Sequence, residues 1–326
     1  MEAYLGRCLE SLLITELDTL EVIVVNDGSH DSTSEIAHQF ADKYPGTFRV
    51  IDKTNGNYGS CINAALPTVT ARYVRLLDAD DYYDTVALRD FVHALRDIDA
   101  DAVFTGYRVV DTNGRTSCPV YSMMKLDIEY GRIYALNDIK TRFVNPSVQV
   151  QMHEVTFKTK LLKQIGYRQL EGVSYSDSQW AIIPLAYCHT TCFVNLSIYC
   201  YFTGRSGQTM TAEHLKRHYS DMLKVNQAMV AFCENTDVVN PDILVNQVAN
   251  RHISAFNRAL LNCDHESITS FREFDKTLPN SLYKTAEKYR YLRYYRRLGC
   301  PNSLAVAYLW RFLTFLNSNL RTWFAK

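Results

Sequence analysis

The chain has 326 residues, with 35 Lys and Arg against 35 Asp and Glu, and 47% of its residues are hydrophobic. This length suggests about two domains, and the apolar fraction excludes a wholly disordered chain. A formal net charge of zero argues against a general nucleic-acid binder, which needs a basic excess.

The nine cysteines are scattered without a CxxC pair, a pattern that fits free thiols in a reducing compartment. Cys188 and Cys192 flank His189, but no matching ligand pair occurs elsewhere, so thiols without a metal are favoured. The first residues include Glu2 and Arg7, unlike a signal peptide, and no apolar run has the length of a membrane span. We therefore expect a cytoplasmic protein.

Strand and helix signals alternate along the first part of the chain, beginning with a helix near Glu2. Short apolar runs that end in polar turns predict strands, and capped amphipathic stretches predict the helices between them. Strands are expected at 21–25, 48–52, 72–77 and 101–105, and helices at 31–44, 59–66 and 84–98. This alternation predicts a layered α/β domain with a mostly parallel sheet.

The pattern loosens after Tyr107 and becomes almost wholly helical from Thr211. Strands are expected at 148–157 and 191–202, and helices at 159–165, 177–187, 211–234, 241–262, 267–278, 281–297 and 303–320. We therefore expect an α/β catalytic domain over residues 1–208 and a helical C-terminal extension over 209–326.

Asp78-Ala79-Asp80-Asp81 follows the strand expected at 72–77. Side chains alternate along an extended segment, so Asp78 and Asp80 leave the strand end on the same side. Close carboxylates repel unless a cation or a shared proton offsets them, and Mg²⁺ or Mn²⁺ does this with a diphosphate as co-ligand. The alternative is a solvated acidic turn. The carboxyl end of a parallel strand, where open α/β sheets bind ligands, favours the site.

Two further polar loops follow predicted strands, Asn26-Asp27-Gly28-Ser29 and Asn55-Gly56-Asn57-Tyr58-Gly59. Gly28 permits a tight turn, and Asp27 can accept hydrogen bonds from a base or a ribose. Asn57 lies in a glycine-containing loop suited to close approach by a ligand. Each loop alone also fits an ordinary turn and helix cap. Three such loops at successive strand ends favour one shared cleft.

The segments EAYLGRCLESLL, EVIVVNDGSHDST, NGNYGSCINAAL and YVRLLDADDYY, in this order and spacing, resemble family 2 glycosyltransferases of the GT-A fold. The similarity covers roughly residues 2–205 and is closest to bacterial enzymes that build capsular, exopolysaccharide or cell-wall glycans. It implies a Rossmann-like nucleotide-diphospho-sugar transferase domain. It also implies a nucleotide-sugar donor, with a UDP-sugar favoured, and a glycan or lipid-linked acceptor. Residues 211–326 carry no motif of the family.

The resemblance assigns roles to the strand-end acids. Asp27 matches the family's nucleotide-contacting acid, and Asp78 and Asp80 match the DxD pair that holds the ribose and a Mn²⁺ or Mg²⁺ ion on the donor diphosphate. Asp81 matches the acid after this pair, whose role varies. Asp177 matches the general base of an inverting single displacement, and its alternative role is a helix N-cap. The two roles are compatible.

Three other residues are candidates for ligand contact. Arg205 follows the last strand, where the family often has a loop that closes over the diphosphate, and a planar cation suits phosphate; a surface arginine is the alternative. His153 lies on the strand expected beside the acceptor, although a structural histidine is favoured. Trp180 can stack on a sugar, although a core tryptophan is the more ordinary outcome.

The amino end departs from the family, which begins with a strand of the VSIIIPVYN type before the helix that starts here near Glu2. Loss of an interior strand leaves the backbone groups of its neighbours unpaired. We therefore expect a misassigned start or a truncated chain. The alternative function is a catalytically inert nucleotide-sugar-binding protein.

The C-terminal segment is strongly basic. From Lys284 to Lys326 there are nine Lys and Arg and one acid, Glu287, and residues 289–297 interleave aromatic and cationic side chains. Residues 304–316 are apolar except for Arg311 and Thr314. Such a segment is typical of peripheral attachment to the anionic inner face of a membrane. The alternative is a helical cap on the catalytic domain with a solvated basic face.

Overall fold

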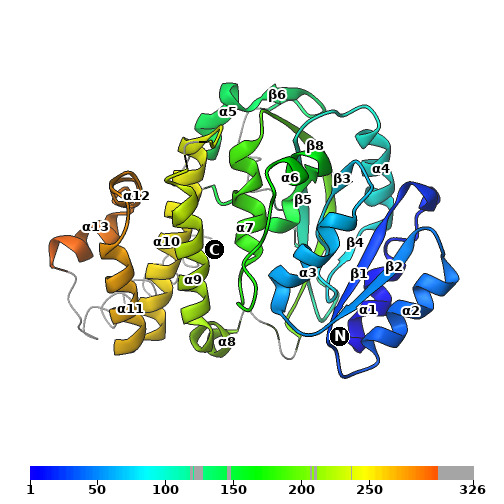
Figure 1. Ribbon diagram of the computed structural model, residues 1–326, viewed down its shortest axis with the longest axis horizontal. Coiled ribbons are helices and arrows are strands. Elements are labelled where there is room, and N and C mark those ends of the chain that lie inside the picture. The colour runs from blue at the N-terminus through cyan, green and yellow to red at the C-terminus, as the bar shows by residue number, and fades with distance from the viewer. Residues whose placement is uncertain are drawn as a thin grey trace, which may run out of the picture. The chain divides into compact units, whose positions relative to one another are not determined.

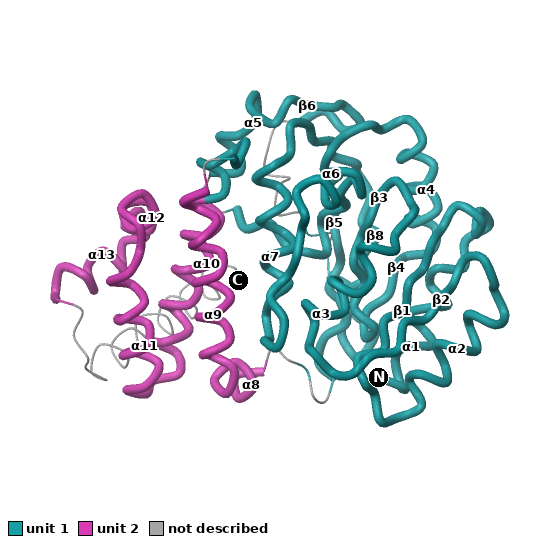
Figure 2. The backbone as a smooth tube through the Cα atoms, in the orientation of Figure 1, with its two compact units in different colours: residues 1–208, 237–244 teal, residues 209–236, 245–326 magenta. Residues whose placement is uncertain are grey.

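The computed structural model describes residues 1–117, 120, 128–144, 148–205, 208, 211–235 and 237–299 (Figure 1). The chain divides into two compact units, residues 1–208 with 237–244 and residues 209–236 with 245–326 (Figure 2). The side chain of Asn240 donates hydrogen bonds to the carbonyls of Ala186 and Cys188, which ties its segment to the first unit. The assignment of residues 1–208 and 209–326 as separate domains stays a prediction.

The first unit alternates strands and helices much as the sequence predicts. Its strands are β1 (Val22–Asp27), β2 (Phe48–Lys53), β3 (Tyr73–Val74), β4 (Tyr82–Tyr83), β5 (Ala102–Asp111), β6 (Ile133–Ala135), β7 (Val155–Lys158) and β8 (Thr190–Thr203). Its α-helices are α1 (Glu2–Glu10), α2 (Thr33–Lys43), α3 (Asn57–Ala65), α4 (Thr85–Leu95), α5 (Leu136–Phe143), α6 (Thr159–Gln164) and α7 (Asp177–Ile182). Short 3-10 turns cover Leu17–Thr19, Leu66–Thr68, Met152–Glu154 and Pro184–Tyr187.

The described strands form two sheets. β1 and β2 are a parallel pair in which Asp27 lies opposite Lys53. The remaining strands form one sheet in the order β3-β7-β5-β8-β4, with β6 paired to β8. In this sheet β5 and β8 run parallel, whereas β3–β7, β5–β7, β4–β8 and β6–β8 are antiparallel.

The predicted α/β class is confirmed, but the expectation of a mostly parallel sheet is corrected, because the larger sheet is mixed. The direction of a short strand depends on the segments that connect it to its neighbours. The residues of the strand itself do not encode this direction. The reversed strands β4, β6 and β7 have only two to four residues each. Among the described strands, only the parallel pairs β1–β2 and β5–β8 match the expected direction.

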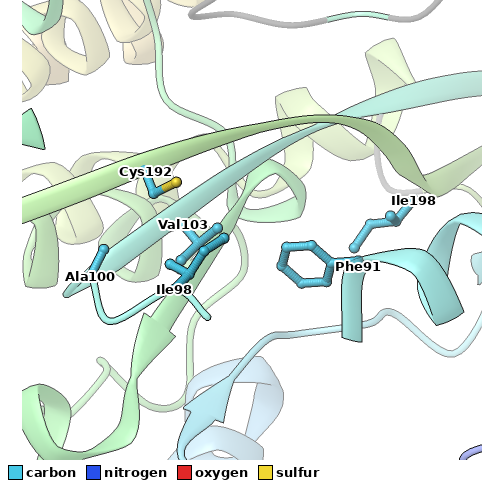
Figure 3. Close-up of a cluster of buried hydrophobic side chains, with 6 residues drawn as sticks. All are labelled: Phe91, Ile98, Ala100, Val103, Cys192 and Ile198. Atoms are coloured by element: carbon cyan, nitrogen blue, oxygen red, sulfur yellow. The ribbon is translucent and has the colours of Figure 1, made fainter. Parts of the chain in front are cut away.

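A hydrophobic cluster packs α4 against β5 and β8 (Figure 3). It consists of Phe91, Ile98, Ala100, Val103, Cys192 and Ile198. Burial of one large apolar side chain contributes roughly 1.5–3 kcal/mol, so this cluster fixes α4 on the sheet. At the start of α4 the side chain of Asp84 accepts a hydrogen bond from the amide of Ala87 at 3.0 Å and so caps the helix.

The second unit is helical in its described part. Its helices are α8 (Ala212–Arg217), α9 (Tyr219–Phe232), α10 (Pro241–Asn262), whose first turn belongs to the first unit, α11 (His265–Lys276), α12 (Asn280–Ala286) and α13 (Arg290–Arg297). The helix predicted over 281–297 is therefore broken in two, because residues 287–289 leave the helical path and Tyr289 is extended. The helix predicted over 303–320 lies outside the described residues.

The core of the second unit contains a buried ion cluster. The carboxylate of Asp275 accepts hydrogen bonds from Arg296 Nε at 2.9 Å and Nη2 at 2.6 Å, and lies 2.7 Å from His252 Nε2. The guanidinium of Arg296 also stacks over the Tyr283 ring at 3.6 Å. These contacts join α10, α11, α12 and α13. Among the described helices, none is both long and apolar enough to span a bilayer.

Candidate active site

Three carboxylates converge in the turn between β3 and β4. Ligand oxygens of Asp78, Asp80 and Asp81 all lie within 4.8 Å of one another. The turn is closed by a hydrogen bond from the amide of Asp81 to the carbonyl of Asp78 at 3.0 Å. This geometry concentrates negative charge at one point on the first unit.

Asp81 is held inside the protein. Its carboxylate accepts a hydrogen bond from the Tyr199 hydroxyl at 2.6 Å and another from the amide of Phe202 at 2.7 Å. Burial raises the pKa of Asp81 to about 7. The two hydrogen bonds lower the pKa, but burial has the larger effect. Both oxygens of Asp81 therefore have partners on β8, and this residue anchors the acidic turn to the larger sheet.

Asp78 carries the least compensated charge of the cluster. Its Oδ1 atom is buried and has no hydrogen-bond partner among the described residues. Burial raises its pKa well above the usual range, and the charges of Asp81, Asp80 and Asp177 raise it further. A hydrogen bond with Tyr58 acts in the opposite direction. A buried carboxylate oxygen without a partner, beside other acids, is a donor set that fits Mg²⁺ or Mn²⁺.

Asp80 is paired with Arg205, which follows β8 in the sequence. Arg205 Nε donates to Asp80 Oδ2 at 2.7 Å, and Arg205 Nη2 donates to the same oxygen. The guanidinium of Arg205 lies 5.4 Å from the centre of the Tyr4 ring. Arg7, also on α1, donates to the carbonyl of Asp80 at 3.2 Å. The structure thus brings Arg205 to the acidic cluster, with α1 beside it.

Asp27 is held in a second polar group at the ends of β1 and β2. Its carboxylate accepts hydrogen bonds from Lys53 Nζ at 2.7 Å and from the amide of Gly56 at 2.9 Å. Gly28 has a φ of +72°, and a Cβ there would lie 3.0 Å from the amide nitrogen of Asn55. Lys53 was not predicted from the sequence as a site residue. The parallel register that places it opposite Asp27 was the signal that could have found it.

α3 starts beside Asp27, and its second residue reaches the acidic cluster. Asn57 has a φ of +65° and is the first residue of this helix. Tyr58 follows and hydrogen-bonds Asp78, and burial together with the charges of Asp78 and Asp177 raises the pKa of Tyr58. Tyr58 therefore lies near both of these acids. No role for Tyr58 was predicted from the sequence, since its position near these two acids depends on the fold.

The segment before α7 packs directly on α3. A Cβ at Gly59 would lie 2.1 Å from the carbonyl oxygen of Leu170, so only glycine permits this approach. Asn63 donates to the carbonyl of Gln169 at 2.8 Å, and the amide of Gly172 donates to the carbonyl of Gly56 at 2.9 Å. These contacts fix the segment that leads to Asp177.

Asp177 is the first residue of α7. Its charge contributes to the raised pKa values of Asp78, Tyr58 and, after burial, Tyr167. Asp177 thus acts electrostatically on both Asp78 and Tyr58.

Trp180 and His153 lie in aromatic packing. Trp180 is fully buried and meets Phe157 and Tyr167 edge-on, with ring centres 5.6 and 5.8 Å away. It is therefore a core tryptophan. The ring centre of His153 lies 4.0 Å from that of Tyr107, and Tyr199 and Tyr201 also contact it. In this position His153 is packed as a structural histidine would be.

A family model for "Glycosyl transferase family 2" matches residues 2–159. The chain carries a family 2 glycosyltransferase domain. The family 2 domain is also similar to the uncharacterized glycosyltransferase EpsJ of Bacillus subtilis, with 30% identity over 36% of this chain and 34% of EpsJ. It is 35% identical to the chondroitin synthase of Pasteurella multocida over 34% of this chain and 12% of that protein. The matched region thus spans about a third or less of these curated relatives.

Solved structures extend the likeness beyond the family 2 domain. Residues 1–349 of S. aureus TarS, in complex with UDP-GlcNAc, match 95% of this chain and 88% of that one, with a TM-score of 0.68 and 20% identity. The mannosyltransferase PcManGT of Pyrobaculum calidifontis, in complex with GDP-Man and Mn²⁺, matches 94% of this chain and 81% of that one, with a TM-score of 0.51 and 16% identity. These likenesses confirm the predicted GT-A fold.

Proposed function

We propose that this chain is an inverting glycosyltransferase. It moves a sugar from a nucleoside-diphosphate donor, with a UDP-sugar favoured, to a hydroxyl of a glycan or lipid-linked acceptor. The observation that carries the proposal is the convergence of Asp78 and Asp80 in one turn, with Asp177 near Asp78. The family assignment and the nucleotide sugars bound in the TarS and PcManGT structures support it.

The donor nucleotide is assigned to the loops after β1 and β2. Asp27 contacts the base or ribose, and Lys53 limits the charge that Asp27 presents there. The positive φ values of Gly28 and Asn57 let the backbone approach the ligand closely. Arg205 supplies a planar cation for the diphosphate, and Asp81 contributes by holding the acidic turn against β8.

Asp78 and Asp80 would hold Mn²⁺ or Mg²⁺, because their oxygens are close together and Oδ1 of Asp78 is buried with no hydrogen-bond partner in the described part of the chain. When bound, the cation offsets the negative charge that builds up on the leaving nucleoside diphosphate. The protein contributes a fixed pair of carboxylates whose mutual repulsion favours binding of a cation.

Asp177 is the general base of the proposed reaction. Its carboxylate removes the proton of the acceptor hydroxyl while that oxygen attacks the anomeric carbon and the bond to the diphosphate breaks. One displacement of this kind inverts the anomeric centre. The first turn of α7 holds the carboxylate in place, and a well-placed base typically contributes about 10²–10⁴-fold in rate.

The test is sugar transfer or donor hydrolysis from a panel of nucleotide sugars with Mn²⁺ or Mg²⁺, with the product anomer assigned by NMR. Asp177→Asn should lower kcat by about 10²–10⁴-fold. Asp84→Asn is the matched control, since it changes another acid at a helix N-terminus and keeps the cap, and its kcat should be unchanged. Full activity of Asp177→Asn contradicts the proposed base. Nucleotide binding without turnover of any donor supports the inert alternative.

We also propose peripheral attachment of the helical extension to an anionic membrane, through a surface formed by Arg290, Arg293, Tyr294, Arg297 and Leu298 of α13 and its end. Tyr294 is 49% exposed and Leu298 is 71% exposed. None of these arginines has an acidic partner among the described residues, and residues 288–326 contain no Asp or Glu. Unpaired cations beside exposed apolar groups suit an anionic lipid surface. A cytoplasmic location stays a prediction.

Vesicle sedimentation at low salt tests this surface. The chain should bind vesicles with anionic phosphatidylglycerol and not vesicles of phosphatidylcholine alone. The triple change Arg290→Gln, Arg293→Gln and Arg297→Gln should weaken binding by about 100-fold, at ~1 kcal/mol for each basic residue. The matched control changes Lys216, Arg217 and Lys224, which are already paired with acids. Equal effects of the two triple changes contradict the proposed surface.

A further inference from the structure

The pair formed by Arg205 and Asp80 is largely removed from water. The side chain of Arg205 is 8% exposed and that of Asp80 is 15% exposed. Both Nε and Nη2 of Arg205 donate to the single oxygen Oδ2 of Asp80. Screening by solvent is weak at this exposure, so this ion pair is stronger than an ordinary surface pair.

Arg205 neutralises the acidic cluster only in part. Asp81 uses Tyr199 and a backbone amide as its partners, and Oδ1 of Asp78 stays without a partner among the described residues. One guanidinium pairs with one of three neighbouring carboxyl groups. A divalent cation carries twice the charge of the guanidinium and can bind oxygens of two carboxylates at once.

We propose that Arg205 is an exchangeable counter-ion of the carboxylate cluster. It occupies Asp80 when no divalent cation is bound, and it moves its guanidinium to the donor diphosphate when cation and nucleotide bind together. This inference rests on the proposed function. The cation then has to displace Arg205 from Asp80, and the displaced guanidinium gains a phosphate partner only when a nucleotide is present. Cation and nucleotide therefore strengthen each other's binding.

The surroundings of Arg205 permit such an exchange. Gly204 precedes it with a φ of +86°, directly after β8, and a Cβ at Gly204 would meet nothing closer than 3.6 Å. Arg7 keeps its own contacts with the Asp80 carbonyl and with the rings of Tyr82 and Phe202. The backbone of the acidic turn is therefore held by Arg7 and need not move when Arg205 leaves.

The experiment measures Mn²⁺ binding by electron paramagnetic resonance without nucleotide, and then UDP binding by calorimetry at saturating Mn²⁺. Arg205→Gln should bind Mn²⁺ alone about tenfold more tightly than the unchanged chain and UDP about tenfold more weakly, each shift equal to ~1.4 kcal/mol. Arg205→Lys keeps the charge but loses the planar fork, so it should shift both affinities in the same directions by less.

Arg7→Gln is the matched control. It removes a cation next to the cluster that touches the carbonyl of Asp80 and not its carboxylate, so Mn²⁺ affinity should change less than threefold. If Arg205→Gln, folded as judged by its unfolding curve, weakens both ligands or leaves Mn²⁺ affinity unchanged, Arg205 is a fixed structural bridge and the inference is overturned. If the unchanged chain binds no Mn²⁺ even with UDP or GDP, the metal-dependent function and this inference both fail.

Discussion

Asp78 in the first unit and Asp275 in the second unit both have buried carboxylate oxygens, but their surroundings are opposite. Asp275 receives hydrogen bonds from Arg296 and lies against His252. Burial alone would raise the pKa of Asp275, but these partners outweigh it and lower the pKa. Asp78 has other acids as neighbours, and its pKa is raised. A buried acid with its own hydrogen-bond partners and a paired arginine stabilises a fold, whereas a buried acid among other acids is suited to bind a cation from outside.

Loss of Asp275, the acid paired with Arg296, should have the largest effect on stability. Asp275→Asn leaves Arg296 buried without a counter-charge, which should lower the free energy of unfolding by about 3–5 kcal/mol. Urea denaturation followed by circular dichroism measures it. Asp221→Asn is the control: its partners His218 and Lys224 are partly exposed, so its effect should stay below about 1 kcal/mol. Equal losses for the two variants would contradict the comparison.

Removal of Asp78, the uncompensated acid, should instead raise the free energy of unfolding. Asp78→Asn relieves the repulsion among three carboxylates, so the free energy of unfolding should rise by roughly 1–3 kcal/mol, since one pKa unit corresponds to ~1.4 kcal/mol. The same denaturation experiment measures it. Asp80→Asn should lower stability, because it leaves Arg205 without its partner. A less stable Asp78→Asn would mean that the cluster is a structural feature of the fold.

Acidification should affect the two units in opposite ways. Burial lowers the pKa of His252 in the folded state, although Asp275 raises it. The unfolded chain therefore binds a proton near pH 6.5 that the folded second unit excludes. Stability of that unit should fall below this pH by up to ~1.4 kcal/mol per pH unit. The raised pKa of Asp78 has the opposite effect: it lowers the stability of the first unit at neutral pH, and this loss disappears as the pH falls.

Hydrogen exchange read by mass spectrometry, compared at pH 7 and pH 5 after correction for intrinsic rates, separates these two contributions. Peptides from α10 and α11 should lose protection at the lower pH, while those around Asp78 should not. His252→Gln should remove the pH dependence of the α10 and α11 peptides. Unchanged pH dependence in that variant would assign the effect to another group.

The smallest expected effect concerns the anchor of the acidic turn. Tyr199→Phe removes the hydroxyl that donates to Asp81 and should lower the free energy of unfolding by about 1 kcal/mol. Tyr83→Phe is the control, because its hydroxyl hydrogen-bonds the carbonyl of Leu76 at 3.2 Å and the side chain of Arg75 instead of a carboxylate of the cluster. Mn²⁺ binding should weaken in Tyr199→Phe and not in Tyr83→Phe. A neutral result for Tyr199→Phe would show that the Phe202 amide alone holds Asp81.

The sequence predicted the strand-end loops well, since glycines and short polar side chains mark turns locally. The convergence of Asp78 and Asp80 was predicted from strand alternation, but β3 ends at Val74 and a turn brings these carboxylates together. The two carboxylates do converge as predicted, but the cause is a turn and not strand alternation. The residue types therefore predicted where a turn occurs, but they did not predict the geometry of that turn.

Contacts between distant parts of the chain escaped the sequence analysis. Tyr58 and Tyr199 interact with Asp78 and Asp81 only after the fold is formed, and nothing in their local sequence marks them. The break between α12 and α13 was missed for a similar reason. No glycine or proline stands between them, and Tyr289 leaves the helical path where its hydroxyl binds Asn257 at 3.1 Å.

The missing side chain at Gly59 lets two regions of the proposed site pack directly on each other. α3 touches the backbone at Leu170 directly. The loop that we assign to the nucleotide, at one end of this helix, and the chain leading to Asp177 therefore have no layer of side chains between them at this point that could absorb a displacement. A nucleotide that stiffens the start of α3 should therefore also stiffen the approach to α7, so that arrival of the donor prepares the acceptor side before any acceptor is present.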